Sequence, residues 1–380
     1  MSLSLPEPLR GPGFGSYRGD EVSWLLTDLS ALNLEAETAE RESRIQSGVA
    51  HYAESLPIEY QPDPDYQALF DDVLAGTAKR LAHAVGAVTE LVLAERGPDI
   101  VLASLARAGT PIGILMRRWA RQRHGLDLQH YAVSIVRARG IDRIALEYLA
   151  VHHDPSSVVF VDGWTGKGAI AKELTQALTL VEAEGGPVFS DDLAVLADPG
   201  HSVRTFGTRD DFLIASACLN STVSGLVSRT VLNPELLGPR EFHGAKFYSG
   251  LAASDVSGVL LDAVSEQFEA VAPDVLAGTD ALAASDRRVT FAGWAAVEQI
   301  QERYGIESVN FVKPGVGEAT QVLLRRVPWK ILVREADHPD HVHLRLLAER
   351  RGVPVEVVPD LAYSCVGLVR RVSAGDPGEG

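Results

Sequence analysis

The chain has 380 residues, of which 46% are hydrophobic and 23% charged, a composition typical of a folded protein with room for two domains. Its formal net charge of −16 argues against a protein whose whole surface grips nucleic acid. With two cysteines, Cys218 and Cys365, it has neither a disulfide framework nor a cysteine-rich zinc site. No signal peptide and no membrane span are recognisable, so we expect a cytoplasmic protein.

Residues 1–98 have the pattern of a mainly helical region that packs on the domain that follows. Within residues 20–30, the residues Val22, Leu25, Leu26 and Leu29 fall on one face of a helix. A proline-rich loop follows at residues 56–66, and a helical period then resumes over residues 66–85. This region is therefore predicted to consist of helices joined by one loop.

Residues 99–270 alternate short apolar strands with helices. The strands are "DIVLASL", "HYAVSIV", "SVVFVD" and "DLAVLAD". Because these runs are apolar throughout, they predict an α/β fold with a doubly wound parallel sheet that helices cover on both faces. Residues 271–288 are rich in Ala, Asp and Gly and are predicted to be a linker, and residues 289–371 repeat the α/β pattern on a smaller scale.

A glycine-rich loop follows the third strand and opens a helix. Asp162 ends the strand, and the loop contains Gly163, Gly166 and Gly168. Ligands of doubly wound sheets bind beyond the carboxyl ends of the strands, and amides at a helix N-terminus favour anions. The loop is therefore predicted to cradle a phosphate, the alternative being a glycine-rich turn without a ligand. Its spacing matches neither the nucleotide P-loop nor the dinucleotide motif.

Two more loops at strand ends carry arginine. Arg107 opens the turn of residues 107–110 after the first strand, and Arg137, Arg139 and Arg143 follow the second strand. Guanidinium groups match the geometry of phosphate oxygens. Three successive strand ends therefore predict a site for a polyphosphorylated sugar, although solvated surface arginines are the simpler interpretation of any one of them.

The order of these loops resembles that of the type I phosphoribosyltransferases. Residues 20–270 more closely resemble the phosphoribosyltransferase-like proteins encoded with bacterial tellurite-resistance and stress genes, through "SLARAGTPIG", "FVDGWTGKGAI" and "FLIASACLNSTVSGLVSRT". The resemblance implies a type I phosphoribosyltransferase-like fold. It also implies phosphoribosyl diphosphate with Mg²⁺ as the ligand and transfer of phosphoribose to a nucleobase-like acceptor.

The resemblance also implies roles for individual residues. It gives catalysis to Asp162, Arg137 and Arg139, and a water-mediated magnesium contact to Asp162. Substrate binding is assigned to Arg107, Ala108, Gly109, Thr110, Asp162, Gly163, Thr165, Gly166, Lys167 and Gly168. From their places in the sequence, Ser221 and Thr222 in a hydroxyl-rich loop and Asp198 at a strand end are further substrate-binding candidates, with magnesium as the alternative for Asp198. The usual ribose loop has a second acid where this chain has Gly163. A non-catalytic stress protein that binds a nucleotide or RNA is therefore a second alternative.

The first alternative is a cysteine protease, a name that the same stress-related family also carries. Cys218 would be the nucleophile and His243 the base, since a thiolate–imidazole pair is the chemistry that such an enzyme requires. His51 is another candidate base, and Asn220, Asp210 or Asp211 could orient the imidazole. A lone cysteine among alanine and leucine is more often a small buried hydrophobic residue.

The last region resembles a pelota-type RNA-binding domain, through "GVGEATQVLLRRVPWKILV", "LAERRGVPVEVV" and "YSCVGLVRR". The resemblance implies that a glycine-rich loop before a helix approaches structured RNA, with Gly315, Gly317, Glu318 and Arg325 as the binding residues. Residues 289–371 hold 11 Lys and Arg against 10 Asp and Glu, whereas the rest of the chain holds 24 against 41. The acidity therefore lies outside this domain. Homo-oligomerisation is left open by the sequence.

Overall fold

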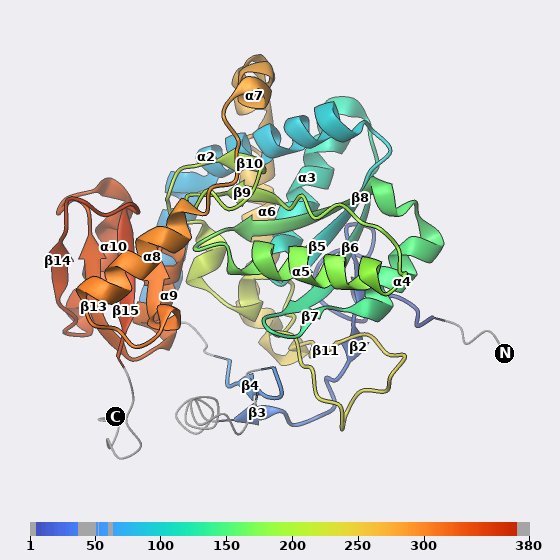
Figure 1. The fold of residues 1–380 in the computed structure, drawn as a ribbon, viewed down its shortest axis with the longest axis horizontal. Helices are drawn as coiled ribbons and strands as arrows, with labels where there is room; N and C mark the ends of the chain where they lie inside the picture. The colour runs from blue at the N-terminus through green and yellow to red at the C-terminus, as the bar shows by residue number, and fades with distance from the viewer. Residues whose placement is uncertain (1–4, 37–50, 52, 60–63, 371–380) are drawn as a thin grey trace.

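The computed structural model describes residues 5–36, 51, 53–59 and 64–370, and has a mixed α/β fold with a small C-terminal domain (Figure 1). The central sheet has the order β1-β6-β5-β8-β9-β10, and all of these strands run parallel, while β7 pairs antiparallel with β6. Its strands are β1 (Ser23–Leu25), β5 (Val101–Ala106), β6 (Gln129–Val136), β7 (Gly140–Ile141), β8 (Val158–Trp164), β9 (Ala194–Ala197) and β10 (Thr205–Thr208).

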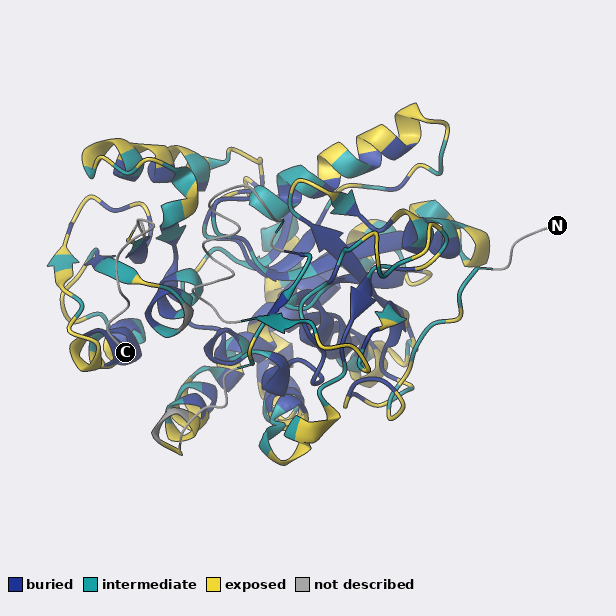
Figure 2. Ribbon diagram, turned by 90° about the horizontal axis from the view of Figure 1, so that it is seen from below, coloured by how far each residue is buried: buried dark blue, intermediate teal, exposed yellow. Residues whose placement is uncertain are grey.

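Helices cover both faces of this sheet, as the apolar strands predict (Figure 2). One layer contains α2 (Pro64–Arg96), α3 (Gly109–His124), α6 (Ser257–Ser265) and α7 (Phe268–Ala284), and the other contains α4 (Arg143–His152) and α5 (Ala169–Ala183). On β5, Leu102 faces the first layer, whereas Val101 and Ala103 face the second. Among the described residues, none of the helices combines the length and apolar character needed to cross a bilayer.

Two predictions for the flanking segments are wrong. The helix expected over residues 20–30 is replaced by strand β1, which pairs with β6, and by β2 (Thr27–Asp28), which pairs with β11 (Gly244–Ala245). Trp24 and Leu25 are both fully buried, because this edge strand is covered on both sides, and consecutive buried residues imitate part of a helical stripe. The expected linker at residues 271–288 is instead largely helix α7.

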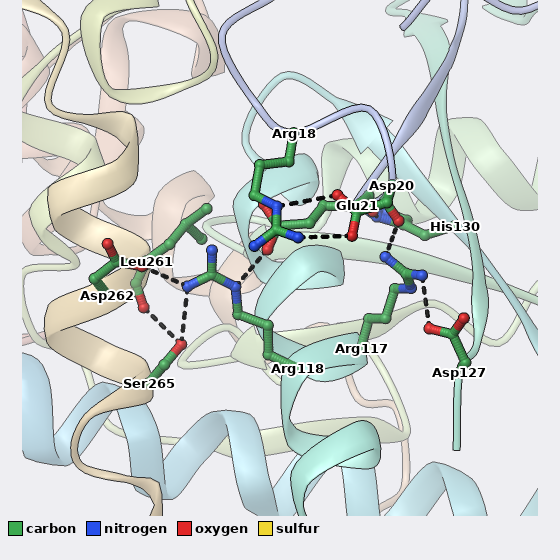
Figure 3. Close-up of polar contacts among 10 residues, drawn as sticks. All are labelled: Arg18, Asp20, Glu21, Arg117, Arg118, Asp127, His130, Leu261, Asp262 and Ser265. Carbon is green, nitrogen blue, oxygen red and sulfur yellow. Dashed lines mark hydrogen bonds and ion pairs between the residues drawn. The ribbon is translucent and has the colours of Figure 1, made fainter. Parts of the chain in front are cut away.

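Charged side chains tie the segment before β1 to the helical layer (Figure 3). Arg118 of α3 donates to Glu21 Oε1 at 2.6 Å and to Asp262 Oδ1 of α6 at 2.8 Å. The neighbouring Arg117 donates to Asp127 Oδ1 at 2.6 Å. These contacts join three segments that are far apart in the sequence, so they help to fix β1 at its edge of the sheet.

The remaining short elements connect the larger ones. They are β3 (Glu35–Ala36) with its parallel partner β4 (Leu56–Pro57), and the 3₁₀ helices η1 (Pro155–Ser157), η2 (Ala215–Cys218), η3 (Ser221–Val223) and η4 (Ser249–Ser254). Among the described residues up to 98, α2 is the single α-helix, so this region is not mainly helical outside 64–96.

The C-terminal domain has a four-stranded mixed sheet of order β12-β15-β13-β14. Its elements are α8 (Ala292–Arg303), η5 (Val309–Phe311), β12 (Val312–Pro314), α9 (Val316–Arg325), β13 (Pro328–Val333), η6 (Pro339–His341), α10 (Val342–Arg350), β14 (Val355–Val357) and β15 (Cys365–Val369). One face of the sheet has a hydrophobic cluster of its own, which includes Val297, Val312 and Leu332. Helix α9 packs between this sheet and the first domain (Figure 1).

A pair of identical substitutions in α2 should have opposite effects on stability. A Cβ atom on Gly86 would lie 2.6 Å from the ring of Trp119, which is fully buried, so Gly86→Ala should destabilise the fold by about 1–3 kcal/mol. Gly76 has nothing within 4 Å of its Cβ position, so Gly76→Ala should stabilise the helix by up to about 1 kcal/mol. Urea unfolding measures both, and equal effects would contradict the packing described.

Candidate functional site

Two glycine-containing turns meet at the carboxyl edge of the central sheet. They follow β5 and β8, which are neighbours in the sheet. A Cβ atom on Gly109 would lie 2.3 Å from the carbonyl oxygen of Val161, and one on Gly163 would lie 3.3 Å from that of Ala108. The structure therefore brings the 107–110 turn and the 162–168 loop into direct contact, as their places at the strand ends predict.

The carboxyl group of Asp162 lies between these turns and is short of polar partners. It accepts a hydrogen bond from the backbone amide of Gly163 at 2.8 Å, and burial raises its pKa to about 7. Its loop contributes no second acid, and no group of three metal-binding side chains occurs among the described residues. A solitary carboxyl that readily keeps its proton fits Mg²⁺ poorly, so no step below depends on magnesium.

The side chains of Thr165, Lys167 and Asp198 are engaged within the protein. Thr165 donates through Oγ1 to the carboxylate of Asp198, which is fully buried and also accepts from Arg209 Nη1 at 2.7 Å. Lys167 is 2% exposed and donates from Nζ to the carbonyl oxygen of Val309 at 2.5 Å, and burial lowers its pKa to about 8. These contacts hold the loop and attach the C-terminal domain to it.

The rest of the 165–168 loop is covered by the C-terminal domain. A Cβ atom on Gly166 would lie 2.8 Å from Glu318 Oε1, and Tyr363 donates from its hydroxyl to the carbonyl oxygen of Gly166 at 3.0 Å. A Cβ atom on Gly168 would lie 2.9 Å from the ring of Phe291. In this arrangement the loop that was predicted to cradle a phosphate is in contact with protein side chains.

The arginine loop after β6 is held against α5. The backbone amides of Ala138 and Gly140 donate to the two carboxylate oxygens of Glu173 at 2.8 and 2.9 Å. Arg137 is half-buried, whereas Arg139 is exposed. The two arginines therefore differ in surroundings, although the sequence suggests the same role for both.

Arg107 links the turn after β5 to the segment that follows Cys218. It donates from Nη2 to Asn220 Oδ1 at 2.9 Å, and its Nη1 lies 3.5 Å from Glu59 Oε1. The other oxygen of Glu59 accepts from Ser221 Oγ at 3.0 Å. Thr222, like Ser221, is buried. The role of Glu59 could not be predicted, because its partners are far away in the sequence and nothing near it forms a motif.

Cys218 and His243 lie in different surroundings. Cys218 ends η2, is 2% exposed, and belongs to a hydrophobic cluster that includes Val316 of α9. His243 precedes β11, its Nδ1 hydrogen bonds to Ser134 Oγ at 2.8 Å, and burial lowers its pKa. Its neighbour Phe242 packs in the cluster on the opposite face of the sheet. The geometry does not favour a Cys218–His243 pair, which stays a prediction.

The glycine loop predicted to bind RNA lies at the boundary between the two domains. The carboxylate of Asp211 accepts from the backbone amide of Val316 at 2.8 Å, at the start of α9. A Cβ atom on Gly317 would lie 3.4 Å from the ring of Trp164 and 3.5 Å from Ala217 Cβ. Gly315, Gly317 and Glu318 therefore all face the first domain. The side chain of Arg325 lies outside the described part of the chain.

Comparison with known proteins shows the family. Residues 15–265 match the family described as "Tellurite-like stress resistance cysteine protease StiP". The chain is also 35% identical over 376 residues to the cysteine protease StiP of Acinetobacter baylyi, with 95% of each chain covered. The chain belongs to the StiP family. Residues 291–371 separately match the PELOTA RNA binding domain, so the resemblance of this region is confirmed.

The phosphoribosyltransferase function inferred from the loops is therefore wrong. Both the family and the Acinetobacter relative are named as cysteine proteases, which was the alternative. Glycine-rich turns at the carboxyl edge of a parallel sheet occur in α/β proteins of many functions, so they do not identify a reaction. The three loops do lie at the edge of the sheet, but the roles in phosphoribosyl transfer that were assigned to their residues no longer apply. The family's description also contains the stress and tellurite resistance that the resemblance implied.

Replacing Asp162 by asparagine should stabilise the fold at pH 8 and change it little at pH 4. The pKa of this carboxyl is about 7 in the folded chain and ordinarily 3.8. The folded state therefore binds its proton more tightly, and stability is lost as the pH rises from about 4 to about 7. A difference of about three pH units corresponds to at most about 4 kcal/mol, since part of the residue is exposed.

Urea unfolding of both proteins at the two pH values measures this effect. The matched control is Asp99→Asn, because Asp99 is exposed and its replacement should give no such pH-dependent gain. An equal effect of Asp162→Asn at pH 4 and pH 8 would show that the carboxyl is not held in a protonated state by burial.

Proposed function

We propose that the first domain is a cysteine peptidase whose nucleophile is Cys218. One observation carries this proposal. The family match spans residues 15–265, a range that contains one cysteine, since Cys365 lies beyond it. A cysteine protease needs a cysteine within the domain that defines its family, and Cys218 is the single residue that meets this condition.

The surroundings of Cys365 support the same choice. Cys365 is fully buried in β15, and burial together with the nearby carboxylate of Asp211 raises the pKa of its thiol well above the ordinary value. The thiolate is the nucleophilic form, so these surroundings oppose attack by Cys365. Its place in the core of the C-terminal domain is that of a packing residue.

The proposed reaction is acyl transfer to sulfur. The thiolate of Cys218 attacks the carbonyl carbon of a peptide bond, a C–S bond forms, the C–N bond breaks, and the amine leaves with a proton. Water then cleaves the thioester, which releases the acid and restores the thiol. The Arg107 guanidinium is held on Asn220, two residues after Cys218, and lies 3.5 Å from a carboxylate oxygen of Glu59. His243 is not assigned as the base, because its Nδ1 hydrogen bonds to Ser134 and its neighbour Phe242 packs on the opposite face of the sheet from Cys218.

Cys218→Ala should remove peptidase activity, whereas Cys365→Ala should keep it. Hydrolysis of fluorescently labelled casein measures the activity, and loss of the nucleophile should lower the rate at least about a thousandfold. Urea midpoints of both variants show whether each is folded. Full activity in folded Cys218→Ala would refute the assignment of the nucleophile.

We further propose that the C-terminal domain binds structured RNA, because residues 291–371 match an RNA-binding domain. The start of α9 presents a glycine loop and helix amides, which can hold a phosphate without a basic surface. The amide of Val316 is already used by Asp211, whose carboxylate occupies the place of an anion. RNA that uses this amide would therefore compete with Asp211.

Asp211→Ala in the full-length chain should strengthen RNA binding. The substitution frees the Val316 amide, so a folded RNA with a bulge should be retarded in a gel at lower protein concentration than with the wild type. Binding should weaken as salt rises, because phosphate contacts release counterions. The control is Asp210→Ala, which removes the same charge next to Asp211 from a side chain that is 61% exposed. No retardation by any of the three proteins at low salt would leave a protein-interaction module as the better account.

A further inference from the structure

We infer that the C-terminal domain holds the proposed peptidase closed, with α9 covering the turn that carries Cys218 and Asp211 acting as the latch. The inference rests on the proposed role of Cys218. It goes further by assigning the surface of α9 and the contact of Asp211 to the control of access to that thiol.

Helix α9 lies directly on η2, the turn that ends at Cys218. A Cβ atom on Gly317 would be 3.5 Å from Ala217 Cβ, which is an ordinary van der Waals contact and leaves no room for a third group. The cavity that remains between the two domains here has a volume of about 10 Å³, enough for one water molecule. A peptide substrate cannot reach Cys218 through this surface while α9 occupies it.

The latch joins two parts of the C-terminal domain to the segment that leads into η2. One oxygen of Asp211 accepts from the Val316 amide at 2.8 Å, and the other accepts from the amide and the hydroxyl of Ser364 at 3.0 and 2.7 Å. A carboxylate at a helix N-terminus also interacts favourably with the helix dipole. Asp211 lies seven residues before Cys218, so release of the latch acts on the same segment that carries the thiol.

One part of the core of the C-terminal domain is independent of the first domain. Its cluster around Val297, Val312 and Leu332 is built from its own residues, whereas buried residues of α9 and α10 belong to the cluster of the first domain. The chain enters it through residues 285–291, which form neither helix nor strand. Other polar contacts also join the domains, among them Arg80 with Asp340 at 2.9 Å, Lys167 with the carbonyl oxygen of Val309 and Tyr363 with that of Gly166. Asp211 differs from these because its one carboxylate holds two separate segments of the C-terminal domain.

The test measures access to the thiol directly. Wild type and variants are treated with iodoacetamide under native conditions, and mass spectrometry follows the labelling of Cys218 and Cys365 separately. Two variants open the contact by different means: Asp211→Ala removes the latch, and Gly317→Leu places a side chain where Trp164 and Ala217 stand. Their controls are Asp210→Ala and Gly278→Leu, because Gly278 is an exposed helical glycine with nothing near its Cβ position.

Both opening variants should label Cys218 at least about tenfold faster than the wild type, the factor that about 1.4 kcal/mol of lost docking free energy produces. Both controls should label at the wild-type rate. Wild-type labelling rates in the two opening variants, with urea midpoints showing that they are folded, would overturn the inference. If either opening variant fails to fold, the remaining one is compared with the milder Asp211→Asn, which keeps the shape of the side chain but loses one acceptor oxygen. Labelling of Cys218 at the wild-type rate in both would again overturn the inference.

Casein hydrolysis by the same proteins separates this inference from the proposed function. Faster labelling of Cys218 without hydrolysis by any of the proteins would mean that the domains open as inferred but that the chain is not a peptidase. Hydrolysis that depends on Cys218, with labelling and activity unchanged in both opening variants, would mean that the peptidase is real and the latch is not.

Discussion

The half-buried carboxylate of Asp211 accepts hydrogen bonds from two segments of the C-terminal domain that are distant in sequence, the start of α9 and the residue before β15. It comes from the first domain, in the segment between β10 and η2. Burial raises its pKa, so the cost of desolvating the charge is offset only while these donors are in place. This contact joins the start of α9 to the segment that leads into η2, beside the small cavity between them.

The strands of the central sheet could be predicted because each is marked by a short run of neighbouring apolar residues. Runs such as residues 158–161 are apolar throughout, and only a strand that is covered on both faces needs that pattern. The strand ends then placed the turns at 107–110 and 162–168 on one edge. Strand β1 could not be found in this way, because Trp24 and Leu25 are buried by residues far along the chain and their spacing also suits a helix.

The candidate site was harder to predict because its contacts are not local. Glu59 meets Ser221 and Arg107 across long stretches of sequence, and no pattern near Glu59 marks it. The loops that do form sequence patterns led to the prediction of the wrong reaction. A glycine-rich turn with an arginine indicates affinity for anions, but it does not identify the reaction that a protein catalyses. Cys218, the proposed nucleophile, stands in a sequence that also suits a buried hydrophobic residue, and it is buried.

The boundary between the domains is rich in ionisable groups whose charged forms are disfavoured. Burial raises the pKa of Asp211 and lowers the pKa values of Lys167 and Lys313. Separation of the domains would return these groups to water and recover part of their hydration, which opposes the gain from the apolar contacts of α9. An interface built only of apolar side chains would have no such opposing cost. The free energy of docking is therefore a balance of terms of opposite sign, and the hydrogen bonds of Asp211 are one of the favourable terms.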